Sequence, residues 1–146
     1  MDLSLPAGFQ WSALHCGIKQ DTSCADYVLV RCDHGTAGAG VYTRNRVFAA
    51  PVAWDRERTP ASDIRVVVIN SGNANACTGD QGWQDVEAMA VSAATACEAQ
   101  VDQALVMSKP HPVIGRLGTV ANQQSIAARL ARADCPHPTV LRQQQP

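Results

Sequence analysis

The hydrophobic residues of this chain are grouped in short runs, most of which predict β-strands. Residues 26–32 place four apolar residues between polar ones, which is typical of a strand. Residues 33–36 have the composition of a turn, so residues 38–43 are expected to return as the second strand of a hairpin. Residues 65–69 are almost continuously apolar and β-branched, which predicts a strand buried on both faces. Residues 101–107 predict one more strand.

The segment between the last two predicted strands has the periodicity of a helix. Residues 85–100 carry apolar side chains at intervals of three and four. Most of that stripe is small, so the helix can pack closely on a sheet; it consists of Val86, Met89, Ala90, Ala93, Ala96 and Cys97. Earlier in the chain, Pro51 biases Ala50 away from helix, which predicts an extended segment at residues 49–52. Residues 56–63 are charged, as in an exposed connection or a short helix end. This order of elements predicts a layered α/β fold.

Composition narrows the class of protein. The chain has 146 residues, 46% of them hydrophobic, which is enough for one domain with a core. A net charge of −1 gives no indication of a nucleic acid or a membrane as partner. No apolar run approaches the ~18 residues of a membrane span, and the first six residues lack the regions of a signal peptide. We therefore expect a cytoplasmic protein whose six cysteines are thiols.

The composition changes near residue 109, which predicts a domain at residues 1–108 followed by a divergent tail. Residues 109–146 hold five of the eight prolines, one acidic side chain and no aromatic residue. We expect this tail to be flexible, with one weak helix at residues 120–133. Within it, Cys135 and His137 are a minor candidate for a zinc ligand pair, but scattered thiols are the favoured alternative and no metal site is expected.

Residues 70–79 form an uncharged polar loop between a predicted strand and the predicted helix. They include three Asn, two Gly, one Ser, one Thr and one Cys. Loops in this position often bind ligands, so Asn70, Asn73 and Asn75 are candidate substrate-binding residues. The alternative is that their amides tie the loop together. Cys77 is either a nucleophile activated by the helix N-terminus or a small buried thiol.

Other polar residues give weaker indications of chemistry. Thr78 or Asp80 is a candidate N-cap for the helix. Lys19 either binds an anionic group or is simply solvated. His15 and His34 have no carboxylate or cysteine partner at a diagnostic spacing, so both are interpreted as ordinary residues.

Several blocks of the first 108 residues resemble the N-terminal part of the bifunctional ornithine acetyltransferase / glutamate N-acetyltransferase family of arginine biosynthesis. The blocks follow the family's order and spacing over about three-quarters of the chain. They are Pro6-Ala7-Gly8-Phe9, Gly17-Ile18-Lys19, Asp26, residues 39–43 with Asn45, residues 49–52, residues 70–79, Gly82 and Asp85.

The resemblance implies a specific activity. Family members cleave themselves before a Thr, which becomes the N-terminal nucleophile of a second (beta) chain. That Thr takes acetyl from N-acetylornithine and passes it to glutamate, with acetyl-CoA as a second possible donor; no cofactor is implied. The family's cytoplasmic enzyme is a heterotetramer, and its layered fold is completed by the second chain. The nucleophile is absent from this chain, so we expect no catalytic residue in the chain itself.

One position departs from the family pattern. The family forms an oxyanion hole from a Ser-Thr-Gly turn, whereas here Ser108 is followed by Lys109 and a Pro-His-Pro stretch. Pro has no N–H to donate, so Ser108 and Lys109 mark an altered oxyanion-hole position. A disturbed coding frame or truncation is one explanation of the change after Ser108, and natural processing is the other.

These observations leave two classes of function open. The first is an acetyltransferase fragment that needs its second chain and is inactive alone. The second is a non-catalytic α/β remnant or interaction module. A stand-alone hydrolase that uses Cys77 is a minor third alternative. In the first two cases we expect the isolated chain to expose an apolar sheet face or edge.

Overall fold

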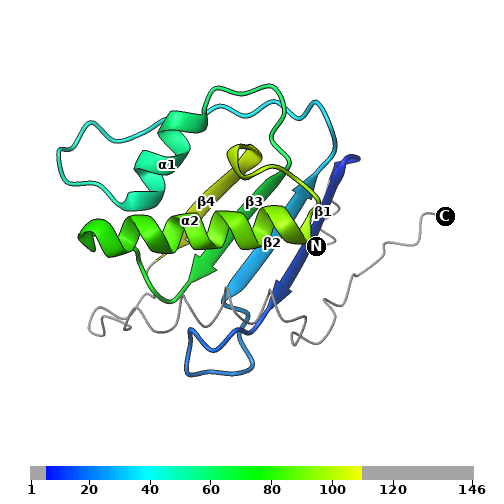
Figure 1. Ribbon diagram of the computed structural model, residues 1–146. Helices are drawn as coiled ribbons and strands as arrows, with labels where there is room; N and C mark the ends of the chain where they lie inside the picture. The colour runs from blue at the N-terminus through cyan, green and yellow to red at the C-terminus, as the bar shows by residue number, and fades with distance from the viewer. Residues whose placement is uncertain (1–5, 110–146) are drawn as a thin grey trace.

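The computed structural model describes residues 6–109, which form a four-stranded mixed sheet with two helices (Figure 1). In chain order the elements are β1 (Phe9–Leu14), β2 (Tyr27–Cys32), α1 (Ala50–Arg58), β3 (Val66–Ser71), α2 (Gly79–Ala96), the 3-10 helix η1 (Val101–Gln103) and β4 (Ala104–Lys109). The predicted α/β layering is confirmed. The proposed tail helix at residues 120–133 lies outside the described residues.

The strands lie side by side in chain order, β1-β2-β3-β4. β1 pairs with β2 and β2 with β3 in antiparallel fashion, whereas β3 and β4 are parallel. The connection between the parallel strands is α2, as expected for a crossover. The carboxyl ends of β3 and β4 therefore meet at one edge of the sheet, together with the loop that leads into α2.

One face of the sheet forms the core beneath the helices. Figure 1 shows α2 lying across the sheet with α1 beside it near β4. Side chains alternate in β3, where Val66 and Val68 are fully buried while Val67 and Ile69 are only half-buried. The buried cluster joins these valines to the small stripe of α2, which includes Ala90 and Ala93. The prediction that this strand is buried on both faces is therefore wrong for the described part of the chain.

The opposite face of the sheet is apolar, and no helix of the described residues covers it. The strand registers place on it the side chains that alternate with the buried ones: Trp11, Val28, Val30, Val67, Ile69, Leu105 and Met107. Trp11 is 48% exposed and Met107 is 45% exposed. The expectation of an exposed apolar sheet face is thus met in residues 6–109.

Two predicted elements were assigned wrongly. The hairpin partner of β2 is β1, which precedes it; residues 38–43 form no strand and contribute one isolated bridge, from Gly38 to Ala61. The segment expected to be extended at residues 49–52 begins helix α1 instead. Pro51 lies in its first turn, where its missing N–H costs nothing because first-turn N–H groups have no partner within the helix.

The remaining boundaries differ less. α2 begins at Gly79, six residues before the predicted start, and the predicted strand at residues 101–107 is divided into η1 and β4. Thr78 does occupy the N-cap position of α2, but its side chain makes no capping hydrogen bond.

Helix α1 is held to β4 by two polar contacts from successive residues. Trp54 Nε1 donates to the carbonyl of Ala104 over 2.9 Å, and Asp55 Oδ1 accepts from the N–H of Val106 over 2.8 Å. Both side chains are buried. They bond backbone groups of the outermost strand, so α1 protects an edge that would otherwise be free to pair with another chain.

No helix among the described residues has the length and apolar character needed to cross a membrane.

Candidate functional site

The polar loop of residues 70–79 lies at the carboxyl ends of β3 and β4, where its amides bond to the loop and to the start of α2. Asn70 Nδ2 donates to the carbonyl of Asn73 over 2.6 Å, and Asn75 Nδ2 donates to the carbonyl of Gly82 over 2.7 Å. Asn70 and Asn75 are buried. These bonds support the structural interpretation of the two amides, and a role in substrate binding stays a prediction for Asn70, Asn73 and Asn75.

Ser108 joins this loop to the end of β4. Its hydroxyl donates to the carbonyl of Asn73 over 2.9 Å and accepts from the N–H of Asn75 over 2.8 Å. The next residue, Lys109, accepts a bond of 3.0 Å at its carbonyl from the N–H of Gly72. Ser108 and Lys109, whose assignment to an altered oxyanion hole stays a prediction, are therefore bonded directly to the polar loop.

Replacing Ser108 by alanine is expected to destabilise the chain by about 1 kcal/mol, because a buried N–H and a carbonyl each lose a partner. Urea denaturation followed by tryptophan fluorescence measures this loss. Ser23→Ala is a suitable control, since the Ser23 hydroxyl bonds only within an exposed turn. Equal stability of Ser108→Ala and the control would contradict the role of Ser108 as a loop bridge.

The start of α2 is packed around Gly82. Thr78 Oγ1 donates to Asn75 Oδ1 in a short hydrogen bond. A Cβ on Gly82 would collide with both of these oxygens. Cys77 is exposed and adopts a positive φ of 57°, so the alternative of a buried thiol is wrong.

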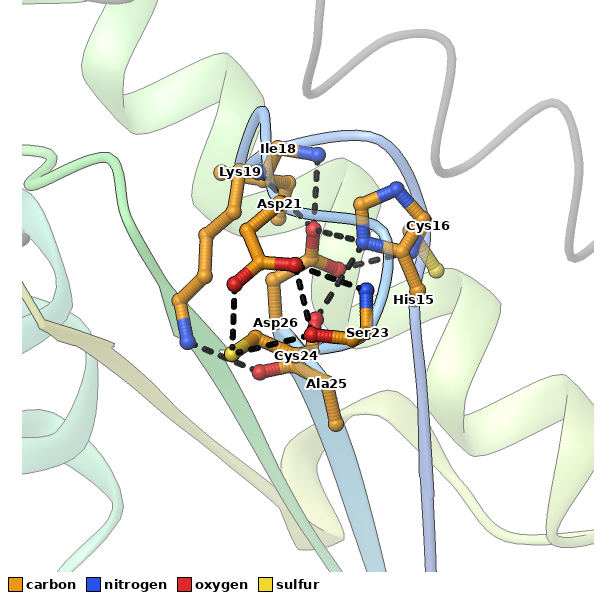
Figure 2. A network of polar contacts seen from close by, with 9 residues as sticks. All are labelled: His15, Cys16, Ile18, Lys19, Asp21, Ser23, Cys24, Ala25 and Asp26. Atoms are coloured by element: carbon orange, nitrogen blue, oxygen red, sulfur yellow. Dashed lines mark hydrogen bonds and ion pairs between the residues drawn. The ribbon is translucent and has the colours of Figure 1, made fainter.

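A second polar cluster lies in the loop between β1 and β2 (Figure 2). Buried Asp26 accepts from the N–H groups of Cys16, Ile18 and Lys19 over 2.7, 2.8 and 2.9 Å. His15 Nδ1 lies 3.1 Å from Asp26 Oδ2 and 3.2 Å from the carbonyl of Cys24. Since both neighbours are acceptors, Nδ1 carries the hydrogen. Sequence spacing gives no indication of this carboxylate neighbour of His15, which the fold brings to it.

Neighbouring residues complete this cluster. The ammonium of Lys19 donates to the carbonyl of Ala25 over 2.8 Å. Asp21 accepts from the Ser23 hydroxyl over 2.6 Å and from the Cys24 thiol over 3.3 Å, and the bonds from Ser23 lower the pKa of the Asp21 carboxyl. His34 also has a carboxylate neighbour, with Nδ1 3.8 Å from Asp63 Oδ1.

Elsewhere in the fold, burial raises the pKa values of two carboxyl groups and two thiols. Burial raises the pKa of Asp55 to about 6, against the bond from Val106 and the charge of Arg58. Burial also raises the pKa of Asp85, against a bond from Gln81. The thiols of Cys32 and Cys97 have raised pKa values for the same reason, which makes them poor nucleophiles. Among residues 6–109, no group of three His, Cys, Asp or Glu is arranged to hold a metal ion.

The chain is similar to known proteins over most of its length. The family model described as the ArgJ family matches residues 10–135. The arginine biosynthesis bifunctional protein ArgJ of Rhodopirellula baltica is 42% identical over 114 residues, covering 75% of this chain and 28% of the relative. The ArgJ protein of Geobacter sulfurreducens is 51% identical over 78 residues, covering 53% of this chain and 20% of the relative. This chain thus spans about a quarter of the length of such relatives.

Two solved structures share the fold. The ArgJ protein of Bacillus halodurans superimposes with a TM-score of 0.72 at 29% identity, covering 85% of this chain and 62% of that one. Ornithine acetyltransferase of Mycobacterium tuberculosis, solved in complex with ornithine, gives a TM-score of 0.68 at 35% identity, covering 86% of this chain and 67% of that one. The family match, these two folds and the polar loop on β3 agree, and this chain belongs to the ArgJ family.

Proposed function

We propose that this chain is the first part of an ornithine acetyltransferase / glutamate N-acetyltransferase that moves acetyl from N-acetylornithine to glutamate. The observation that carries the proposal is the family match over residues 10–135. A homologous structure that contains ornithine supports the substrate class. The nucleophile is a Thr at the start of a second chain from the same precursor, so this chain alone is inactive.

The uncovered face of the sheet supports the need for a second chain. Trp11 and Met107 are both close to half exposed on it, and the side chains between them are apolar. An apolar surface of this kind favours burial against a protein partner. The second chain would cover this face and bring its Thr to the end of β4, and two such pairs would form the heterotetramer.

Within the proposed enzyme, Ser108 and Lys109 occupy the turn that stabilises the developing negative charge on the acetyl oxygen. Loss of one oxyanion-hole donor typically costs about 10²–10³ in rate. Since Lys109 and a Pro-His-Pro stretch stand where the family turn has Thr and Gly, we expect slow acetyl transfer at most. The polar loop, with Asn70, Asn73 and Asn75, forms the wall of the substrate site beside this turn. We expect a cytoplasmic enzyme, although an ArgJ protein of Lodderomyces elongisporus is mitochondrial.

The direct test is reconstitution. The full chain is co-expressed with the second chain of the Geobacter sulfurreducens relative, and N-acetylglutamate formed from N-acetylornithine and glutamate is measured by mass spectrometry. We expect product only when both chains are present and the second chain keeps its N-terminal Thr. A stable complex that forms no product would reject the proposed activity.

Such a result would favour the alternative, a non-catalytic α/β module. The specific observation behind that alternative is the replacement of the Thr and Gly of the family turn after Ser108, which starts at Lys109.

A further inference from the structure

The loop between β1 and β2 is held by a single carboxylate with an unusual number of donors. Asp26 Oδ2 accepts from the N–H groups of Ile18 and Lys19 and lies 3.1 Å from His15 Nδ1. Its Oδ1 accepts from the N–H of Cys16. The carboxylate is thus the shared hydrogen-bond acceptor at the centre of the loop (Figure 2). A buried carboxylate with this many donors is strongly fixed.

The same residue is bonded to the polar loop at the end of β3. The carbonyl of Asp26 accepts from the N–H of Ser71 over 2.8 Å. A Cβ at Gly72 would lie 3.1 Å from Ile18 Cγ2 and 3.0 Å from Lys19 Cγ, so these two side chains pack directly on the Gly72 backbone. Ile18 and Lys19, which the Asp26 side chain holds by hydrogen bonds, are therefore the residues that pack on the polar loop at Gly72.

Gly72 connects the β1–β2 loop to the end of β4. Its N–H donates to the carbonyl of Lys109 over 3.0 Å, and its φ of 114° is open to glycine but rarely to other residues. Gly72 is thus held from one side by Ile18 and Lys19 and from the other by Lys109. A shift of the β1–β2 loop would be transmitted to the end of β4 within one residue.

We infer that Asp26 is a positioning residue, with His15 as its support: it fixes residues 16–19 against Gly72 and thereby holds the end of β4, at Ser108 and Lys109, in place. Its consequence for acetyl transfer rests on the proposed function, whereas its consequence for the loop does not. Asp26 touches neither substrate nor nucleophile in this role, and its side chain acts through the contact of residues 18 and 19 with the backbone of Gly72.

The test uses amide hydrogen exchange of the full chain, measured by NMR. In Asp26→Asn, one carboxylate oxygen is replaced by an NH₂ group, which cannot accept a hydrogen bond. In one orientation of the amide the N–H groups of Ile18 and Lys19 lose their acceptor, and in the other the N–H of Cys16 loses its acceptor. We expect exchange at the N–H of Gly72 to rise roughly tenfold to a hundredfold, as for loss of a charged, buried hydrogen-bond acceptor. Asp21→Asn is the matched control, because the Asp21 carboxyl lies in the same loop but, among residues 6–109, bonds only Ser23 and Cys24; it should leave Gly72 unchanged.

Two variants of His15 keep the test decisive if Asp26→Asn does not fold. His15→Ala removes the ring nitrogen that lies 3.1 Å from Asp26 Oδ2, and His15→Asn supplies an amide N–H near the position of Nδ1. We expect faster exchange at Gly72 in His15→Ala and recovery in His15→Asn. Faster exchange at Ile18 and Lys19 with no change at Gly72 would overturn the inference, because Asp26 would then order only its own loop.

The reconstituted enzyme separates this inference from the proposed function. If the wild-type complex transfers acetyl, Asp26→Asn and His15→Ala should each lower kcat more than they raise KM, and His15→Asn should keep kcat close to that of the wild type. If the wild-type complex is inactive, the proposed function fails, and the exchange at Gly72 still decides the positioning role.

Discussion

Replacing Gly82 by alanine is expected to lower the free energy of unfolding by about 3 kcal/mol, although alanine normally stabilises a helix by about 1 kcal/mol relative to glycine. A Cβ at this position would collide with Thr78 Oγ1 and Asn75 Oδ1, and it would lie 2.8 Å from Thr78 Cβ. Relief of the collision requires the Thr78–Asn75 bond to break and the bond from Asn75 Nδ2 to the Gly82 carbonyl to shift. Urea denaturation followed by circular dichroism measures the change.

The control for Gly82→Ala is Glu87→Ala, at an exposed position of the same helix. Substitutions at such positions usually change stability by less than about 0.5 kcal/mol. A Gly82→Ala variant as stable as the wild type would show that the loop does not depend on the close approach of α2. In that case the fold would not require a glycine at this position.

The elements that the sequence predicts well are those whose signal is local. β2, β3 and the body of α2 are marked by a dense apolar pattern. Most of the predicted stripe is buried, namely Val86, Met89, Ala90, Ala93 and Cys97, whereas Ala96 is exposed. β1 has no such apolar run. Phe9 and Trp11 belong to the face of the sheet that no described helix covers, and both are exposed for that reason. Its pairing with β2 depends on a long loop that carries no short turn signal.

α1 illustrates a tertiary effect that overrides a local preference. Pro51 disfavours helix for Ala50, but both lie in the first turn of α1. The helix is fixed by contacts of Trp54 and Asp55 to β4, about fifty residues later in the chain. Sequence spacing within the helix cannot reveal partners at that separation.

The His15–Asp26 pair was missed for a related reason. The two residues are separated by a loop, and no motif places them at a diagnostic interval. The register of the hairpin pairs Leu14 with Tyr27, so the next positions outward are His15 and Asp26. Recognition of β1 would have been enough to bring them together. The polar loop of residues 70–79, by contrast, could be identified from composition alone, because so many uncharged amides are rarely found in a linker.

The stability of the chain is expected to decrease by about 2 kcal/mol between pH 4 and pH 7 because of Asp55. Burial raises the pKa of this carboxyl from 3.8 to about 6 in the folded state. Between these two values the folded chain binds more protons than the unfolded chain, so the free energy of unfolding falls as the pH rises. The stabilisation is complete below the unfolded pKa and is lost above the folded pKa. Urea denaturation at half-unit steps of pH measures the slope.

Asp55→Asn isolates this contribution from that of Asp85, whose pKa is shifted in the same direction. Asparagine keeps a carbonyl oxygen for the N–H of Val106 but cannot ionise, so the variant should match the wild type near pH 4 and exceed its stability at pH 7. Asp55→Ala removes the acceptor as well and should be less stable than Asp55→Asn at every pH, since Val106 then has an unpaired N–H. Parallel pH profiles for the wild type and Asp55→Asn would mean that the carboxylate is accommodated beside Arg58 without cost, and that α1 is held to β4 by an ordinary charged contact.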